Sequence, residues 1–241
     1  MNFKNYYKRK LPHLQHPGMI FFVTFRLEGS IPKVKLQEIK EQYEIEVMKI
    51  EKETSEEKLK SELQRCSVEY FKKYDSLLDS ILYGPVYFKN SACMEILKEQ
   101  LHRFDGEYYD LICYTIMSNH VHILIDTSIQ LAEGYVNNQT DQKLIPLNEI
   151  MRRIKGASAR YINKHLNKTG TLWESESYDI YIRNEKMLDN VISYILENPV
   201  KAGLVKEWDS YEAAFISMQL RKILVGLEPD SQTGQQTSVR Y

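Results

Sequence analysis

The sequence predicts an α+β fold in which helices cover an antiparallel sheet. A run of β-branched and aromatic residues at 19–27 is typical of a buried strand. Two further apolar runs, 108–117 and 121–125, are separated by the short polar pair Ser118-Asn119, which favours a tight hairpin. Before and after these runs lie segments with apolar residues every three or four positions, as in amphipathic helices.

The remaining elements complete a familiar order. We predict helices at 91–103 and 147–167 from the same periodicity, then a strand at 178–182 and a last helix at 185–198. We expect Pro199 to end the last helix, because proline lacks the backbone donor that a helix needs. Strand, helix, hairpin, helix, strand is the order of a ferredoxin-like sandwich, with helices on one face of the sheet. We therefore expect residues 1–226 to form a single domain.

Three segments depart from this pattern. Residues 34–80 are rich in Glu and Lys with apolar positions at helical spacing, and predict a helical hairpin inserted into the first crossover. Thr54 and Glu57 have capping-box spacing, which places the break between the two helices near 53–55. Residues 127–146 are polar and predict a loop, and we expect a disordered tail at 227–241.

The charge is unevenly distributed along the chain. The formal net charge is −1, which alone does not favour a nucleic-acid partner. Residues 1–29 nevertheless carry five basic and one acidic side chain, and residues 150–206 carry ten basic and six acidic ones. The inserted segment is acidic, with twelve acidic and nine basic residues in 34–80. Two basic segments are therefore hidden in the total.

Composition also bears on compartment. No stretch approaches the roughly 20 apolar residues that span a bilayer, and the basic start lacks the features of a signal peptide. Cys66, Cys93 and Cys113 are far apart and odd in number, so we expect reduced thiols in the core. These features predict a protein of the cytoplasm, without a membrane partner.

His120 and His122 are candidate metal ligands. Side chains two apart on a strand project from the same face, so the two imidazoles should lie side by side, with Val121 and Ile123 facing the other way. Imidazole is a common ligand of divalent transition metals. Alone, this pattern fits surface or hydrogen-bonded core histidines equally well.

Tyr194 and Asn198 form a second candidate pair. They are four residues apart on a predicted helix and share one face, which we expect to point outward, opposite an apolar stripe. A phenol has a pKa of about 10 and is a weak nucleophile unless charge or metal activates its target. The plainer interpretation is that the tyrosine packs on the sheet and the asparagine caps the helix.

Three separated segments resemble the REP-associated tyrosine transposases, relatives of single-tyrosine insertion-sequence transposases within the HUH nuclease superfamily. They are Tyr114-Thr-Ile-Met-Ser-Asn-His-Val-His-Ile-Leu-Ile125, Gly170-Thr-Leu-Trp-Glu-Ser-Glu-Ser-Tyr-Asp179 and Tyr194-Ile-Leu-Glu-Asn-Pro-Val-Lys-Ala-Gly-Leu-Val205. Shorter similarities occur at 9–13, 22–26 and 84–86. The resemblance therefore covers most of the chain outside 34–80, 127–146 and the tail.

The resemblance implies roles for particular residues. His120 and His122 would be the metal-binding pair, Asn198 would complete the site, and Tyr194 would be the nucleophile. Tyr178 is the rival nucleophile, but it lies on a predicted strand without a polar partner four residues away. A divalent cation, Mg²⁺ or Mn²⁺, would polarise the scissile phosphate. The implied product is a 5′-phosphotyrosine in single-stranded DNA that carries palindromic hairpins.

Basic residues supply candidate DNA contacts. We expect them in the N-terminal segment, on the predicted 147–167 helix and beside the tyrosine helix: Arg9, Lys10, His13, Arg152, Arg153, Lys155, Arg160, Arg183 and Lys186. An ordinary solvated helix face explains most of them equally well.

Two other functions compete with a site-specific single-strand DNA nuclease and transposase. A non-catalytic, regulatory single-strand binder with the same fold would form no covalent adduct. A metal-dependent phosphodiesterase that uses water would need the histidines but not Tyr194. The sequence is compatible with a monomer or a homodimer, with the site built in one chain or shared between two.

Overall fold

A computed structural model describes residues 6–8, 12–14, 18–80, 84–132 and 144–225. Its main sheet has five antiparallel strands in the order β6-β3-β5-β4-β7. Their bounds are β3 Ile20–Arg26, β4 Asp110–Ile116, β5 His120–Asp126, β6 Tyr178–Tyr181 and β7 Ala214–Ile216. Without β7, the chain order β3-α3-β4-β5-α4-β6 and this spatial order are those of a ferredoxin-like sheet. The predicted α+β class is confirmed.

Two crossover helices cover one face of the sheet, as predicted. They are α3 (Ser91–His102) and α4 (Leu147–His165), and they pack on the alternate residues of the strands that include Val23 and Ile123. Trp173 is buried in this layer, where its ring contacts Phe25. Its burial indicates a packing role for this indole.

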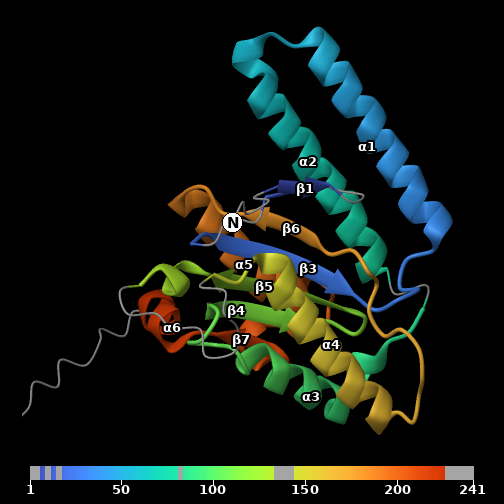
Figure 1. The fold of residues 1–241 in the computed structure, drawn as a ribbon, viewed down its shortest axis with the longest axis vertical. Helices are drawn as coiled ribbons and strands as arrows, with labels where there is room; N and C mark the ends of the chain where they lie inside the picture. Colours follow the sequence, from blue (N-terminus) through green and yellow to red (C-terminus); the bar gives the residue numbers. More distant parts are fainter. Residues whose placement is uncertain (1–5, 9–11, 15–17, 81–83, 133–143, 226–241) are drawn as a thin grey trace, which may run out of the picture.

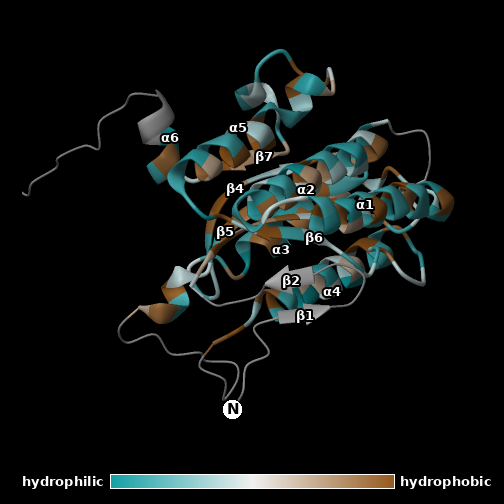
Figure 2. Ribbon diagram, turned by 90° about the horizontal axis from the view of Figure 1, so that it is seen from above, coloured by the Kyte–Doolittle hydropathy of each residue, from teal (hydrophilic) through white to brown (hydrophobic). Residues whose placement is uncertain are grey.

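Helices also cover the opposite face, which the sequence pattern did not predict. This second layer consists of α5 (Glu185–Lys201) and the end of α2 (Glu56–Asp79), packed on residues such as Phe22 and Leu124. Figures 1 and 2 show α4 and α5 on opposite sides of the strands. Both faces of β5 are therefore buried, so its even and odd residues serve different layers.

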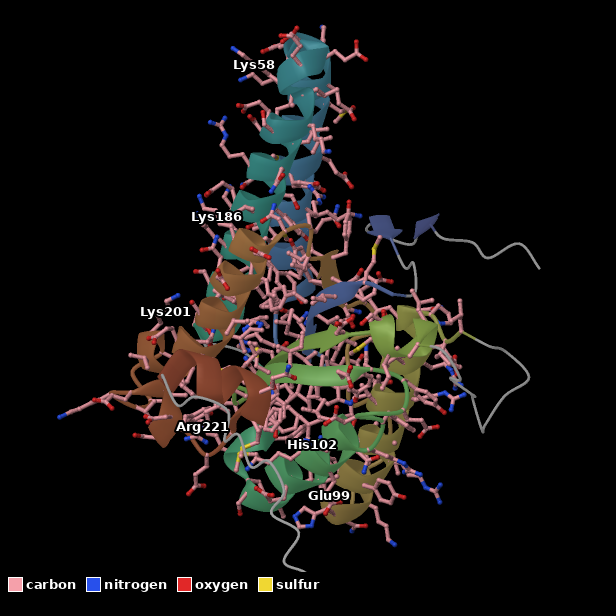
Figure 3. All side chains as sticks on the ribbon, turned by 90° about the vertical axis from the view of Figure 1, so that its left-hand side faces the viewer. Lys58, Glu99, His102, Lys186, Lys201 and Arg221 are labelled. Carbon is pink, nitrogen blue, oxygen red and sulfur yellow. The ribbon has the colours of Figure 1, made fainter. Side chains whose placement is uncertain are left out.

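The predicted inserted hairpin is present. It consists of α1 (Lys33–Glu53) and α2, and it projects away from the sheet as a largely hydrophilic arm with Lys58 near its tip (Figures 1, 2 and 3). The break falls where expected, but Thr54 is the C-cap of α1 and Ser55 is the N-cap of α2, without a side-chain capping bond. Only the last turns of α2 are buried against the sheet, through residues that include Tyr74 and Leu78.

Pro199 does not end α5, contrary to the prediction. The helix continues to Lys201, with Pro199 inside it. Proline removes the N–H that would bond the carbonyl of Ile195, four residues earlier. The Thr115 hydroxyl on β4 donates to that carbonyl instead, at 2.7 Å. This bond fastens α5 to the sheet. It does so next to His122, because Thr115 is the register partner of that histidine.

The other described elements lie at the edges. They are β1 (Tyr6–Lys8), β2 (Pro12–Leu14), α6 (Met218–Val225) and three 3-10 turns at Tyr87–Lys89, Ser128–Leu131 and Trp208–Ser210. Most of the expected 127–146 loop and the whole of the expected tail lie outside the described residues. Cys93 and Cys113 are buried and Cys66 is half-buried, and all three are free thiols. None of the described helices is long and apolar enough to cross a bilayer.

The Thr115 bond leads to a stability prediction. In Thr115→Val the shape is kept but the buried Ile195 carbonyl loses its donor, so we expect unfolding to become easier by about 1–3 kcal/mol. Urea denaturation measures this loss. Thr115→Ser keeps the hydroxyl and is expected to lose less; equal stability of wild type and Thr115→Val would contradict the role given to the bond.

Candidate active site

His120 and His122 lie side by side on β5, as predicted. Their side chains point to the face covered by α5 and α2, while Val121 and Ile123 point to the other core. Both histidines are essentially buried, with 1% and 0% of their surface exposed. The Nε2 atoms of the two rings are 3.0 Å apart. They are therefore core histidines whose nitrogens face one another.

Asn119 determines which nitrogen of His120 is free. The Asn119 amide donates through Nδ2 to the carbonyl of Leu78 at the end of α2, which turns its Oδ1 to His120 Nδ1 at 2.7 Å. A carbonyl oxygen only accepts, so Nδ1 of His120 must carry the hydrogen. The lone pair of His120 is therefore on Nε2, the atom that faces His122.

His122 has a similar arrangement. Its Nδ1 is 2.8 Å from the Thr24 hydroxyl, and its Nε2 is 3.3 Å from Nδ2 of Asn198, which can only donate. With the amide in this orientation, Nε2 of His122 is an acceptor. Burial lowers the pKa of His122 to about 3, and burial together with the neighbouring His122 lowers the pKa of His120 well below its usual value. Two neutral imidazoles thus present two lone pairs to the same point.

Two carboxylates from α2 lie beside the histidines. Asp75 Oδ1 is 3.4 Å from His122 Nε2, and Asp79 Oδ1 is 3.9 Å from His120 Nε2. Burial raises the pKa of Asp75 to about 6, and burial together with the charge of Asp75 raises that of Asp79 to about 7. Asp75, His120 and His122 form a group whose ligand atoms all lie within 4.8 Å of one another, so the cluster could hold a metal ion.

The donor set fits a divalent cation. Oδ1 of Asp75, Asp79 and Asn198 are all buried, and no donor among the described residues reaches any of them. Buried oxygens are seldom left without a partner. Two ligands at right angles around one ion, each about 2.1 Å from it, are about 3 Å apart, which matches the separation of the imidazole nitrogens. Nitrogen and carboxylate ligands together suit Mn²⁺ as well as Mg²⁺.

Tyr194 lies directly beside this cluster. Its ring is 5.3 Å from that of His122, and its hydroxyl donates to Oδ2 of Asp75. Burial, followed by the charge of Asp75, raises the pKa of Tyr194 far above its usual value. The Lys201 ammonium is 5.3 Å from the centre of the ring. The phenol is thus held protonated and hydrogen-bonded at the edge of the cluster.

Tyr178 is close but differently engaged. It lies on the same face of the sheet, opposite Thr24 on β3, and its ring stacks on Phe71 at 4.5 Å. Its hydroxyl interacts with Ser67 on α2 rather than with the histidines. Burial raises its pKa well above the usual value. Of the two candidate tyrosines, the structure brings only Tyr194 into contact with the cluster.

The shared face of Tyr194 and Asn198 does not point outward as predicted. It points toward the sheet, and Asn198 is 2% exposed. Because α5 is enclosed between the sheet and α2, its apolar residues and its polar pair are buried together. The expected proximity of Asn198 to the histidines is present, although its nitrogen rather than its oxygen is nearest to His122.

Four of the nine predicted DNA-binding residues lie away from the cluster. Arg152, Arg153, Lys155 and Arg160 are on α4, which covers the opposite face of the sheet. The first three bond to groups of the protein: two to Glu149, and Lys155 to the carbonyls of Glu174 and Ser175. The structure therefore separates these residues from Tyr194 by the full thickness of the sheet.

The remaining basic candidates are divided. Arg183 and Lys186 are exposed at the start of α5, and Figure 3 shows Lys186 and Lys201 on the same side of the molecule, at the two ends of this helix. The Arg183 guanidinium lies 4.9 Å from the Tyr181 ring and bonds to Gln64. Arg9 and Lys10, and the side chain of His13, lie outside the described residues.

The sequence reasoning missed four polar groups of the site: Thr24, Asp75, Asp79 and Asn119. The two aspartates are four residues apart, one helical turn, on the face of α2 that carries its buried residues. A carboxylate on an otherwise apolar stripe was the available signal. It was hidden among the many acidic residues of the insertion.

Comparisons with known proteins agree with the earlier resemblance. Residues 79–198 match the family model described as IS200-like transposase. Among solved structures, the chain is similar to a REP-associated tyrosine transposase bound to a REP hairpin, with 15% identity and a TM-score of 0.46, over 96% of this chain and 95% of that one. No curated protein matches. At such low identity, the assignment depends on the family match.

Asn119 should matter for metal binding as well as for stability. In Asn119→Ala, His120 loses the acceptor that orients its ring, so we expect affinity for Mn²⁺ to fall about 10- to 100-fold, as measured by calorimetric titration. Asn90→Ala removes the N-cap of α3, far from the cluster, and serves as the control. It should cost about 0.5–2 kcal/mol of stability without weakening Mn²⁺ binding; similar Mn²⁺ affinities in the two variants would refute the proposed orientation.

Proposed function

We propose that this chain is a transposase that cuts and rejoins single-stranded DNA with Tyr194, because it belongs through its residues 79–198 to the IS200-like transposase family. The observation that carries this proposal is the contact of Tyr194 with a buried cluster of His120, His122 and Asp75. The arrangement provides a nucleophile, a proton acceptor and a set of cation ligands within one site.

The chemical step follows from these positions. A bound divalent cation would supply charge neutralisation at the scissile phosphate. His120, His122 and the amide of Asn198 would hold it, and Tyr194 Oη would attack the phosphorus from the Asp75 side. As the bond from Oη to phosphorus forms, the phenol proton passes to Asp75 Oδ2. The bond from phosphorus to the 3′-oxygen breaks, and that oxygen takes a proton from water.

The products are a 5′-phosphotyrosine and a free 3′-hydroxyl. The covalent bond keeps the energy of the phosphodiester, so a 3′-hydroxyl can reverse the step and join strands without a nucleotide cofactor. Asp75 Oδ2 already accepts the hydrogen of the Tyr194 hydroxyl, so it is positioned to take the phenol proton.

The proposed substrate is single-stranded DNA with palindromic hairpins. The motifs around His120 and Tyr194 resemble those of REP-associated transposases, and this resemblance implies an unpaired strand as the substrate. Arg183, Lys186 and Lys201 provide positive charge along α5 for the phosphate backbone. Such an enzyme would act in the cytoplasm.

All the groups of the proposed site come from one chain. We propose a site built within one chain, whether the protein is a monomer or each subunit of a homodimer carries its own. A homodimer would then serve to bring two DNA ends together rather than to complete the site.

A covalent-adduct assay tests the function. With Mn²⁺ and a 5′-labelled or 3′-labelled hairpin oligonucleotide, we expect a protein–DNA adduct that survives denaturing electrophoresis and carries only the 3′ label. Tyr194→Phe and His122→Ala should abolish it, and Tyr178→Phe, which keeps its stacked ring, should retain it.

The alternatives give different results in the same assay. A non-catalytic binder would shift the oligonucleotide in a native gel without forming an adduct. A phosphodiesterase that uses water would cleave it in Tyr194→Phe as well as in the wild type.

A further inference from the structure

We propose that the inserted hairpin completes the catalytic centre: Asp75, near the end of α2, is a ligand of the cation together with His120 and His122, and its second oxygen anchors the Tyr194 phenol. This inference rests on the proposed function and extends it. The family match begins at residue 79, so Asp75 lies outside the matched region. The hairpin would then contribute a residue to the catalytic centre as well as to the fold.

Asp75 is unusually buried for a carboxylate. It is 6% exposed, although aspartate is seldom buried unless it is paired. Oδ2 accepts the phenol hydrogen of Tyr194, but Oδ1 receives no hydrogen bond from any described group. That oxygen lies 3.4 Å from His122 Nε2, which is itself an acceptor. An unpartnered carboxylate oxygen facing an imidazole lone pair indicates a cation between them.

The position of Asp75 is also firmly held. One helical turn later, the carbonyl of Leu78 accepts a hydrogen bond from Asn119, the residue that orients His120. The ring of Tyr74, just before Asp75, and the side chain of Leu78, just after it, are buried against the sheet. The end of α2 is thus tied to the strand that carries the histidines. A carboxylate held in this way is preorganised as a ligand.

A purely structural role does not explain these contacts. A neutral amide at position 75 could still accept the Tyr194 hydrogen and would avoid burying a charge beside Asp79 and two uncharged rings. The carboxylate therefore costs stability in the metal-free protein, as is common for groups that serve a site rather than the fold.

The test compares Mn²⁺ binding and thermal stability in the full-length protein without DNA. In Asp75→Asn we expect Mn²⁺ affinity to fall at least about tenfold by calorimetric titration, while the metal-free protein melts at the same or a higher temperature. Glu69→Gln removes one carboxylate from an exposed position on the same helix and should bind Mn²⁺ as the wild type does.

A second measurement uses the wild type, in case Asp75→Asn does not fold. Crystals soaked in Mn²⁺ should show an anomalous peak within bonding distance of His120 Nε2, His122 Nε2 and Asp75 Oδ1. A peak that contacts both histidines but not Asp75 would overturn the inference. So would unchanged Mn²⁺ affinity in Asp75→Asn, or a lower metal-free melting temperature with unchanged affinity, which is the result of a structural role.

The outcomes separate this inference from the proposed function. If the wild type forms the DNA adduct and Asp75→Asn binds Mn²⁺ normally, the function stands and the role of Asp75 fails. If the wild type binds no Mn²⁺ at all, both fail. If Mn²⁺ binding depends on Asp75 but no adduct forms with any hairpin, the metal site stands and the nuclease function fails.

Discussion

Two buried imidazoles whose unprotonated nitrogens face each other at 3.0 Å impose the main constraint on this structure. Each ring is fixed from behind, His120 by Asn119 and His122 by Thr24. Neighbouring lone pairs repel each other unless a proton or a cation lies between them, and burial opposes the proton. The surrounding carboxylate and amide oxygens supply what a cation would need, and thereby explain why so many polar groups occur in one core.

The rest of the second layer is arranged around that constraint. Pro199 leaves the Ile195 carbonyl without a helical donor, and Thr115 from the strand next to the histidines provides one. This interaction sets α5 over the sheet, so that Tyr194 and Asn198 point at the cluster. From the other side, Asn119, which directly precedes β5, ties the end of α2 to the sheet. Thr115 on β4 and Asn119 before β5 thus hold the two helices in place over the histidines.

Local patterns predicted the α+β class, the order of strands and helices, and half of the groups that meet at the candidate site. Alternation on the strand placed His120 and His122 together, and helical spacing placed Tyr194 with Asn198. The direction of that helical face was wrong, because burial of α5 depends on a layer formed by a distant insertion. Asp75 could not be found for the same reason: it is 45 residues from His120 along the chain, and only packing of α2 brings the two together. Periodicity within a segment carries no information about which segments meet.

The central claim is that Tyr194 becomes covalently linked to DNA, and peptide mapping of the adduct tests it most directly. Adduct formed with Mn²⁺ and a hairpin oligonucleotide would be digested with nuclease and protease, and the modified peptide sequenced by mass spectrometry. The account predicts a nucleotide remnant on Tyr194, joined through its 5′-phosphate. A remnant on Tyr178 or on any other residue, or a cleaved oligonucleotide without a modified peptide, would contradict it.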